Sequence, residues 1–168
     1  MKTLHEVAED HLNVIRANGF EDPLWATNFG WKVALIHTEC DEAIDGVLGS
    51  GKDPLEEELA DIVIRATGCL QAIWPNTWAD RTTSAHDKIN VYRDIDVLLR
   101  PIRKQTTLAM EAWRKANDKD ARSALEMVVK ETFALSDALR FDMRAELDKK
   151  LAKNSKREFR HGTARSEG

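Results

Sequence analysis

Apolar side chains recur every three or four residues along most of this chain, which is the spacing of one face of an α-helix. Segments that alternate apolar and polar residues, as a half-buried β-strand does, are missing from the sequence. Thr3 and Glu6 have the spacing of a helix N-terminal capping box, and Asn18-Gly19, Gly49-Ser-Gly51 and Pro75 mark helix ends. The pattern therefore predicts an all-α protein, with helices over about residues 3–17, 28–48, 55–74, 86–100, 101–116 and 119–153.

Two of these predicted helices carry acidic pairs that lie beside the apolar stripe. Glu39 and Glu42 are three residues apart, so they project from the same side of a helix about a turn apart. Glu58 and Asp61 repeat this spacing on the next helix. Neither pair falls on the expected solvent face, which on the first helix carries His37, Asp41 and Asp45.

The position of the pairs favours a binding site over a solvated surface. A single pair of this kind usually faces water, but two pairs on successive helices, both turned from the solvent face, favour a common site. Four carboxylates there would repel one another unless a cation lay between them. Oxygen ligands suit a hard cation, so the sequence predicts Mg²⁺, with Mn²⁺ as a substitute, at a site that holds phosphates.

The residues around these acids resemble a known family. The segments Lys32-Val-Ala-Leu-Ile-His-Thr-Glu39-Cys-Asp-Glu42-Ala and Glu57-Glu58-Leu-Ala-Asp61-Ile-Val-Ile-Arg65 are similar to the EExxE and ExxD blocks of MazG-like all-α nucleoside triphosphate pyrophosphohydrolases. Thr38 replaces the first Glu of EExxE. A later segment resembles the K-x-x-x-N-x-x-R-x-Y-R-H-G ending of MazG-like proteins, including phage-encoded ones; it is Lys150-Leu-Ala-Lys-Asn154-Ser-Lys-Arg157-Glu-Phe-Arg160-His161-Gly162.

The resemblance, which covers about residues 28–74 and 148–162, implies both a fold and a function. It implies a helical bundle with a four-helix core, in which Glu39, Glu42, Glu58 and Asp61 bind Mg²⁺ and carry catalysis. The implied reaction is hydrolysis of a (deoxy)nucleoside triphosphate to a nucleoside monophosphate and pyrophosphate. The residues that match family positions contacting phosphate or sugar are Lys32, Arg65, Lys150, Asn154, Arg157, Arg160 and His161. Three tryptophans are candidates for stacking on the base, namely Trp31, Trp74 and Trp78.

The same resemblance leaves open how the protein is used. Many relatives assemble from two chains, so we expect a homo-oligomer, a dimer or a tetramer, in the cytoplasm (the host cytoplasm if the chain is phage-encoded). A nucleotide sensor that binds without turnover, or an interaction module on the same fold, stays an alternative, because Thr38 and the second half of the chain both depart from the family pattern.

The second half of the chain aligns, on few identities, with the first. Setting Glu111 against Glu42 and Leu125 against Leu59 brings together two helical hairpins, about residues 28–74 and 101–153. If this is a true duplication, the second hairpin has lost its metal ligands and the chain folds as a pseudo-symmetric bundle. Leu108, Ala124 and Met127 then replace Glu39, Glu58 and Asp61, and we expect Leu108 and Met127 to be buried.

Composition fits one compact helical domain. The chain has 168 residues, of which 42% are hydrophobic and 32% charged, and we expect a domain over residues 1–162 with a disordered tail at 163–168. Apolar runs stay well short of the ~18 residues that span a membrane, and the acidic N-terminus is unlike a signal peptide. A net charge of −4 disfavours duplex nucleic acid as a partner. Cys40 and Cys69 are predicted to be small packing residues inside helices.

Overall fold

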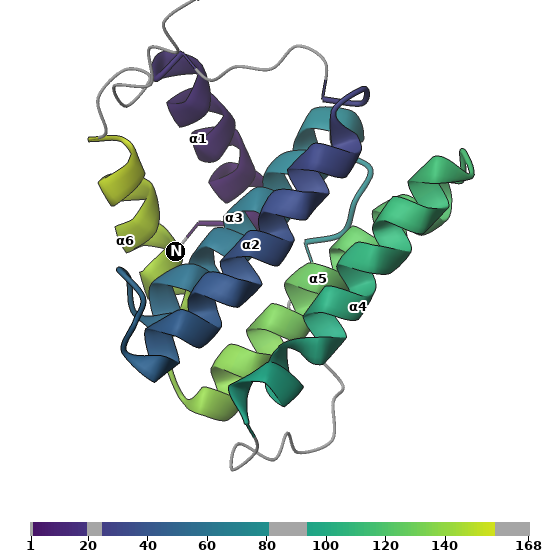
Figure 1. The fold of residues 1–168 in the computed structure, drawn as a ribbon. Helices are drawn as coiled ribbons and strands as arrows, with labels where there is room; N and C mark the ends of the chain where they lie inside the picture. Colours follow the sequence, from purple (N-terminus) through teal and green to yellow (C-terminus); the bar gives the residue numbers. More distant parts are fainter. Residues whose placement is uncertain (1, 20–24, 81–93, 157–168) are drawn as a thin grey trace, which may run out of the picture.

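The computed structural model describes residues 2–19, 25–80 and 94–156, and these ranges contain six helices and no β-strand (Figure 1). The all-α prediction is therefore confirmed. The helices are α1 (Leu4–Ala17), α2 (Phe29–Leu48), α3 (Leu55–Ile73), α4 (Ile95–Arg114), α5 (Asp118–Leu139) and α6 (Met143–Asn154). In this part of the chain, no helix combines the length and the apolar character needed to cross a lipid bilayer.

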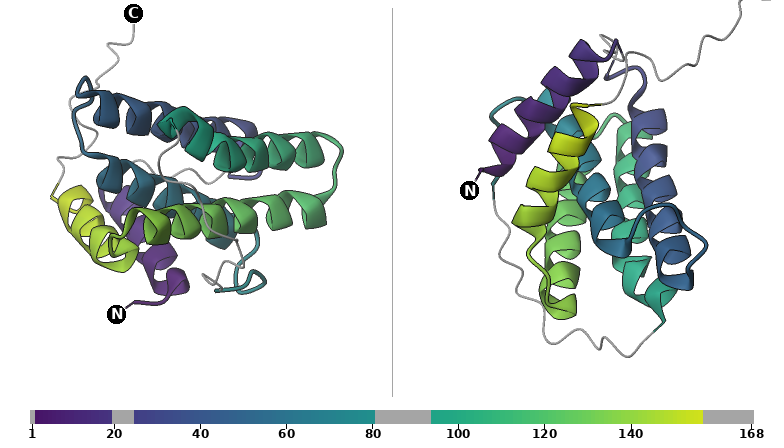
Figure 2. Two further views of the ribbon diagram at one scale, coloured as in Figure 1. Left: turned by 90° about the horizontal axis from the view of Figure 1, so that it is seen from below. Right: turned by 90° about the vertical axis from the view of Figure 1, so that its left-hand side faces the viewer.

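The core is a four-helix arrangement built from two hairpins. α2 packs against α3 and α4 packs against α5; the hairpins then join through α2 against α4 and α3 against α5. Figure 2 shows the resulting two layers, with α1 and α6 on the outer side of α3. Because α3 has neighbours on several sides, most of its side chains are buried, including Leu59, Ile62 and Leu70.

Local sequence explains the ends of the first helices. Thr3 and Glu6 form the predicted capping box at the start of α1, in which each side chain accepts from the other residue's backbone N–H. Gly49 ends α2 with a φ of 76°, a left-handed conformation that glycine adopts without strain. The turn then folds back tightly, since a Cβ on Gly51 would lie 2.7 Å from the backbone N of Gly46. This fold-back brings Asp53 next to the start of α3.

Two predicted helix boundaries are wrong. Pro101 was expected to begin a helix, but α4 runs continuously through it from Ile95. Leu99 and Ile102 are buried on either side of Pro101, so core packing holds one helix together despite the lost backbone hydrogen bond. The expected start of a helix at 86 lies outside the described residues.

The second error is the single helix predicted over residues 119–153. Arg140 ends α5 in a left-handed conformation with a φ of 65°. Asp142 then starts α6, because its side chain accepts from the backbone N–H groups of Arg144 and Ala145. The break turns α6 away from α5 and onto α3, which matters for the candidate site.

The burial expected from the duplication is also wrong in part. Leu108 is 45% exposed, and Met127 is only half-buried. Both residues line a groove between α4 and α5 that the described helices leave uncovered. The cysteine prediction is confirmed, because Cys40 and Cys69 are both buried and free.

Candidate metal centre and adjoining pocket

Three of the four predicted acids come together between α2 and α3. Glu39 of α2 and Glu58 and Asp61 of α3 each place one carboxylate oxygen within 4.8 Å of the others. Glu39 and Glu58 are each only 3% exposed. Because α2 and α3 form a tight hairpin, acids that are separated in sequence converge on one point. This group could hold a metal ion.

The fourth predicted acid, Glu42, lies at the edge of this group. It is exposed, and it does not belong to the three acids that converge. Glu42 nevertheless lines the same cavity, of about 400 Å³, which we name the acid cavity. Its walls are Glu39, Glu42, Asp45, Ser50, Gly51, Lys52, Asp53, Glu58, Asp61 and Arg65.

Burial changes the protonation of the converging acids. Removal from water raises the pKa of Glu58 to about 8, and its hydrogen bond to Glu39 adds to the rise, although Lys150 opposes it. Burial also raises the pKa of Glu39, against the lowering effect of Arg65. These raised pKa values favour one proton shared between Glu58 and Glu39 at neutral pH. A cation that bound here would displace that proton.

Arg65 is the cation beside Glu39. One of its terminal nitrogens lies 2.5 Å from a Glu39 carboxylate oxygen, and its Nε is buried without a hydrogen-bond partner. Arg65 follows Asp61 by one turn of α3, so it lies on the same side of the helix. The sequence predicted Arg65 as a phosphate contact, and the structure places it at the wall of the acid cavity.

Lys150 of α6 is the second cation at the centre, and its side chain is only 1% exposed. Its ammonium donates to Asp61 at 2.9 Å, to Asp53 at 3.1 Å and to Glu57 at 3.3 Å. Burial works against its charge, but the carboxylates of Asp61 and Asp53 outweigh burial and raise the pKa of Lys150. Lys153, one turn further along α6, contacts Asp53 and Glu57 from the exposed side.

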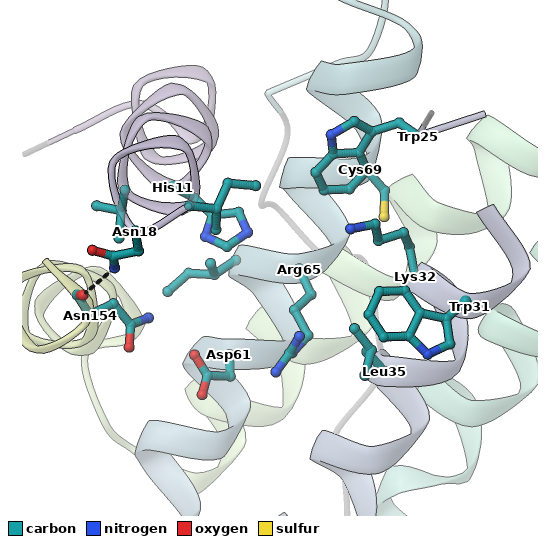
Figure 3. Close-up of a pocket in the computed structure, with 13 residues that line it drawn as sticks. His11, Asn18, Trp25, Trp31, Lys32, Leu35, Asp61, Arg65, Cys69 and Asn154 are labelled. Carbon is teal, nitrogen blue, oxygen red and sulfur yellow. Dashed lines mark hydrogen bonds between the residues drawn. The ribbon is translucent and has the colours of Figure 1, made fainter. Parts of the chain in front are cut away.

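A second pocket adjoins the acid cavity and is named here the ligand pocket. It measures about 390 Å³ and lies among α1, α2, α3 and α6 (Figure 3). Asp61 and Arg65 belong to the walls of both spaces. The remaining walls are His11, Val14, Ile15, Asn18, Trp25, Trp31, Lys32, Leu35, Ile64, Cys69 and Asn154.

Three buried polar atoms in the walls of the ligand pocket have no hydrogen-bond partner. They are Nδ1 of His11, Nε of Arg65 and Oδ1 of Asn154. Buried polar atoms are normally paired, and a ligand or a bound water that reached these atoms would satisfy them. Burial lowers the pKa of His11 to about 3, helped by Arg65 and Lys32, so its imidazole is neutral and offers one donor and one acceptor.

The other predicted binding residues divide into three groups. Lys32 and Asn154 line the ligand pocket, and the Lys32 ammonium lies 4.3 Å from the Trp25 ring centroid and 5.1 Å from that of Trp31. Lys150 lies among the acids. The remaining three, Arg157, Arg160 and His161, fall outside the described residues, as does the predicted tail at 163–168.

Of the tryptophans proposed for base stacking, only Trp31 lines the ligand pocket, and it is 61% exposed. Trp78 is buried and donates to Gln71, while Trp74 is partly buried and packs against Phe29 at the edge of the core. The sequence reasoning missed Trp25 among the pocket walls.

His11 was also missed, since nothing in its local sequence marks it. It reaches the pocket because α1 packs closely on α3 at Gly68, where an added Cβ would lie 2.7 Å from the imidazole ring.

Comparisons of the chain with protein-family models, curated proteins and solved structures each found no match.

Proposed function

We propose that this chain hydrolyses a nucleoside triphosphate to a nucleoside monophosphate and pyrophosphate with the help of Mg²⁺. The observation that supports this most is that the acid cavity and the ligand pocket share Asp61 and Arg65. A ligand can therefore extend from the acids into a pocket with apolar walls and unpaired polar atoms. A nucleoside triphosphate has this division, with phosphates at one end and an aromatic base at the other.

The donor set at the centre fits the proposed ion. Three carboxylates offer only oxygen, which Mg²⁺ prefers, and Mg²⁺ usually retains positions for water and phosphate. A bound divalent cation would neutralise charge on the phosphates and increase the acidity of a water molecule. Glu39, Glu58 and Asp61 would hold it; the family resemblance assigns these three residues together with Glu42.

The remaining side chains would orient the substrate. Arg65 lies where the two spaces meet, so its guanidinium would contact a phosphate oxygen. Lys32 and Asn154 would contact phosphate or sugar, and His11 would form a hydrogen bond with the base. Trp31 and Trp25 offer rings on which a base could stack.

The proposed step is a displacement at phosphorus. A water oxygen bonds to the α-phosphorus, and the bond from that phosphorus to the bridging oxygen breaks, so pyrophosphate leaves with its electron pair. Glu42 lines the acid cavity outside the three converging acids, and we assign it the proton that the attacking water loses.

One observation favours the alternative of a sensor that binds without turnover. In the structure, Glu39 pairs with Arg65 and Asp61 with Lys150, so two of the three acids already have protein cations. A nucleotide could then be held by Arg65 and the ligand pocket alone.

An assay with a panel of ribo- and deoxyribonucleoside triphosphates tests the proposal. With Mg²⁺, at least one substrate should give equimolar pyrophosphate and monophosphate, identified by ³¹P NMR. Release of inorganic phosphate with a nucleoside diphosphate would contradict cleavage at the α-phosphorus. Tight nucleotide binding without any product would favour the sensor.

A further inference from the structure

Lys150 has a contact pattern unlike that of the other cations at the centre. Its ammonium has three donors, and the structure gives it three carboxylate acceptors, on Asp53, Glu57 and Asp61. All three contacts measure between 2.9 and 3.3 Å. The side chain is 1% exposed, so its hydrogen-bonding capacity is used within the protein. A lysine that contacted substrate would need at least one N–H donor that is not already used by the protein.

The carboxylates around Lys150 form a second set of oxygen ligands beside the first. Asp61 belongs to both sets, since it also converges with Glu39 and Glu58. In two-metal phosphoryl-transfer sites a carboxylate commonly lies between ions about 3.5–4 Å apart. Asp61 is the carboxylate that the two sets share, and the ammonium of Lys150 lies within 3.3 Å of a carboxylate oxygen of each acid in the second set.

We propose that Lys150 is a built-in substitute for a second divalent cation, so that the centre binds one metal ion per chain. This inference rests on the metal centre of the proposed function. Lys150 is a positioning residue: it fixes Asp61 beside the metal and supplies a permanent positive charge next to the phosphates without touching them. The family-based expectation that Lys150 contacts phosphate directly is thereby replaced.

The break between α5 and α6 explains how the lysine reaches this place. Arg140 and Asp142 end one helix and start the next, and α6 then packs on the first half of α3. Asp53 lies just before α3, where the glycine turn after α2 folds back tightly. The ammonium therefore ties α6 to the acid-bearing hairpin at the centre itself.

Metal counting tests the inference without reference to activity. Mn²⁺ binding to the full chain, measured by equilibrium dialysis without nucleotide, should give one tight ion for the wild type. Lys150→Ala leaves Asp61 without its lysine and leaves Asp53 and Glu57 paired only with the half-exposed Lys153. Shortening of the side chain also makes room for an ion, so this variant should bind two. Two ions bridged by Asp61 would also broaden each other's electron paramagnetic resonance signal.

Lys153 provides the matched control. It lies on the same helix and contacts Asp53 and Glu57, but it is 45% exposed and its contacts do not include Asp61. Lys153→Ala should therefore still bind one Mn²⁺. A variant that combines Lys150→Ala with Asp53→Asn and Glu57→Gln has lost two acids of the second set. This variant should again bind one Mn²⁺ ion.

The outcomes separate this inference from the function on which it rests. Two ions on the wild-type chain, or one ion on a folded Lys150→Ala variant, would overturn the role of Lys150 and leave the metal centre standing. If Lys150→Ala does not fold, the wild-type count still decides: one ion supports the inference and two overturn it. A wild-type chain that bound no Mn²⁺ would overturn the metal centre and the inference together.

Discussion

The α4–α5 hairpin has a groove in the place where the α2–α3 hairpin has its acid cavity. Leu108, Glu111, Ala124 and Met127 all line this groove of about 500 Å³. These are the positions that the sequence alignment pairs with Glu39, Glu42, Glu58 and Asp61, which all line the acid cavity. Two packed helices thus gather the same four positions in both hairpins, and the side chains at those positions decide whether the space suits a cation.

The acids in the two hairpins also differ in their surroundings. Glu111 is the acid that the second hairpin retains, and hydrogen bonds from Arg114 and then Lys115 lower its pKa to about 2. Burial instead raises the pKa of Glu58 in the first hairpin to about 8. A carboxylate already paired on a surface has little need of a metal, whereas a buried group that holds a proton can exchange it for one.

The largest expected effect is the loss of turnover when an acid is removed from the first hairpin, compared with removal of an acid from the second. Glu39→Gln or Asp61→Asn should lower turnover by more than ~100-fold. Loss of a metal ligand costs more activity than loss of a residue that only hydrogen-bonds to a ligand, which typically costs about 10–100-fold. Glu111→Gln, the control in the second hairpin, should keep turnover near that of the wild type. Circular dichroism should show helical folds for all three. Wild-type turnover in the Glu39→Gln/Asp61→Asn double variant would refute the site.

An acid introduced into α5 distinguishes its core face from its groove face. Leu125 is fully buried, so Leu125→Asp should destabilise the fold by several kcal/mol, the usual cost of an unpaired buried charge. Met127 lies two residues away and is half-buried in the groove, so Met127→Asp should cost only about 1 kcal/mol. Chemical denaturation measures both. An equal loss of unfolding free energy in the two variants would show that the groove is closed in solution.

The proton on Glu58 predicts how metal binding depends on pH. The pKa of Glu58 rises from an ordinary value of 4.5 to about 8, so between these values the folded metal-free protein holds a proton that the unfolded chain lacks. Its stability should therefore fall as pH rises through this window. Metal binding should release about one proton, and the apparent Mn²⁺ affinity should rise about tenfold per pH unit up to about pH 8.

Calorimetry in buffers of different ionisation enthalpy gives the number of protons released. Glu111, with its lowered pKa, adds no proton in this range, so Glu111→Gln should leave that number unchanged. A pH-independent affinity would show that Glu58 is ionised before the metal binds.

The smallest effect concerns the ligand pocket, whose α1 and α6 walls have no counterpart in the groove of the second hairpin. Asn154→Ala removes an unpaired buried oxygen, so thermal stability should not fall. If that oxygen accepts a hydrogen bond from nucleotide, the variant should bind it about tenfold more weakly, by fluorescence titration. Asn13→Ala, an exposed change on α1, should leave affinity unchanged.

Much of the fold could be predicted from periodicity and helix-end residues. The first three helices begin and end within about a residue of their predicted limits, because Thr3, Gly49 and Pro75 act through the local backbone. Pro101 misled the prediction, because the packing of Leu99 and Ile102 outweighed the local preference of proline. The helix start at Asp142 was not predicted, because the apolar spacing of a helix continues through residues 119–153 without a visible break.

The candidate site also contains residues that the sequence predicted and residues that it could not. The spacing within each acid pair placed its members on one side of a helix, and three of the four acids do converge. His11, Trp25 and Asp53 could not be recognised, since each depends on contacts between segments far apart in sequence.

The sequence by itself determined that this protein is helical and that acids line neighbouring turns of two helices, because side-chain periodicity and capping act over a few residues. Only the tertiary structure decided which acids are buried and which cations meet them. Glu39 meets Arg65 and Asp61 meets Lys150 because helices α2, α3 and α6 pack together. Burial and charge pairing depend on everything that surrounds a group, so they are set when the helices assemble.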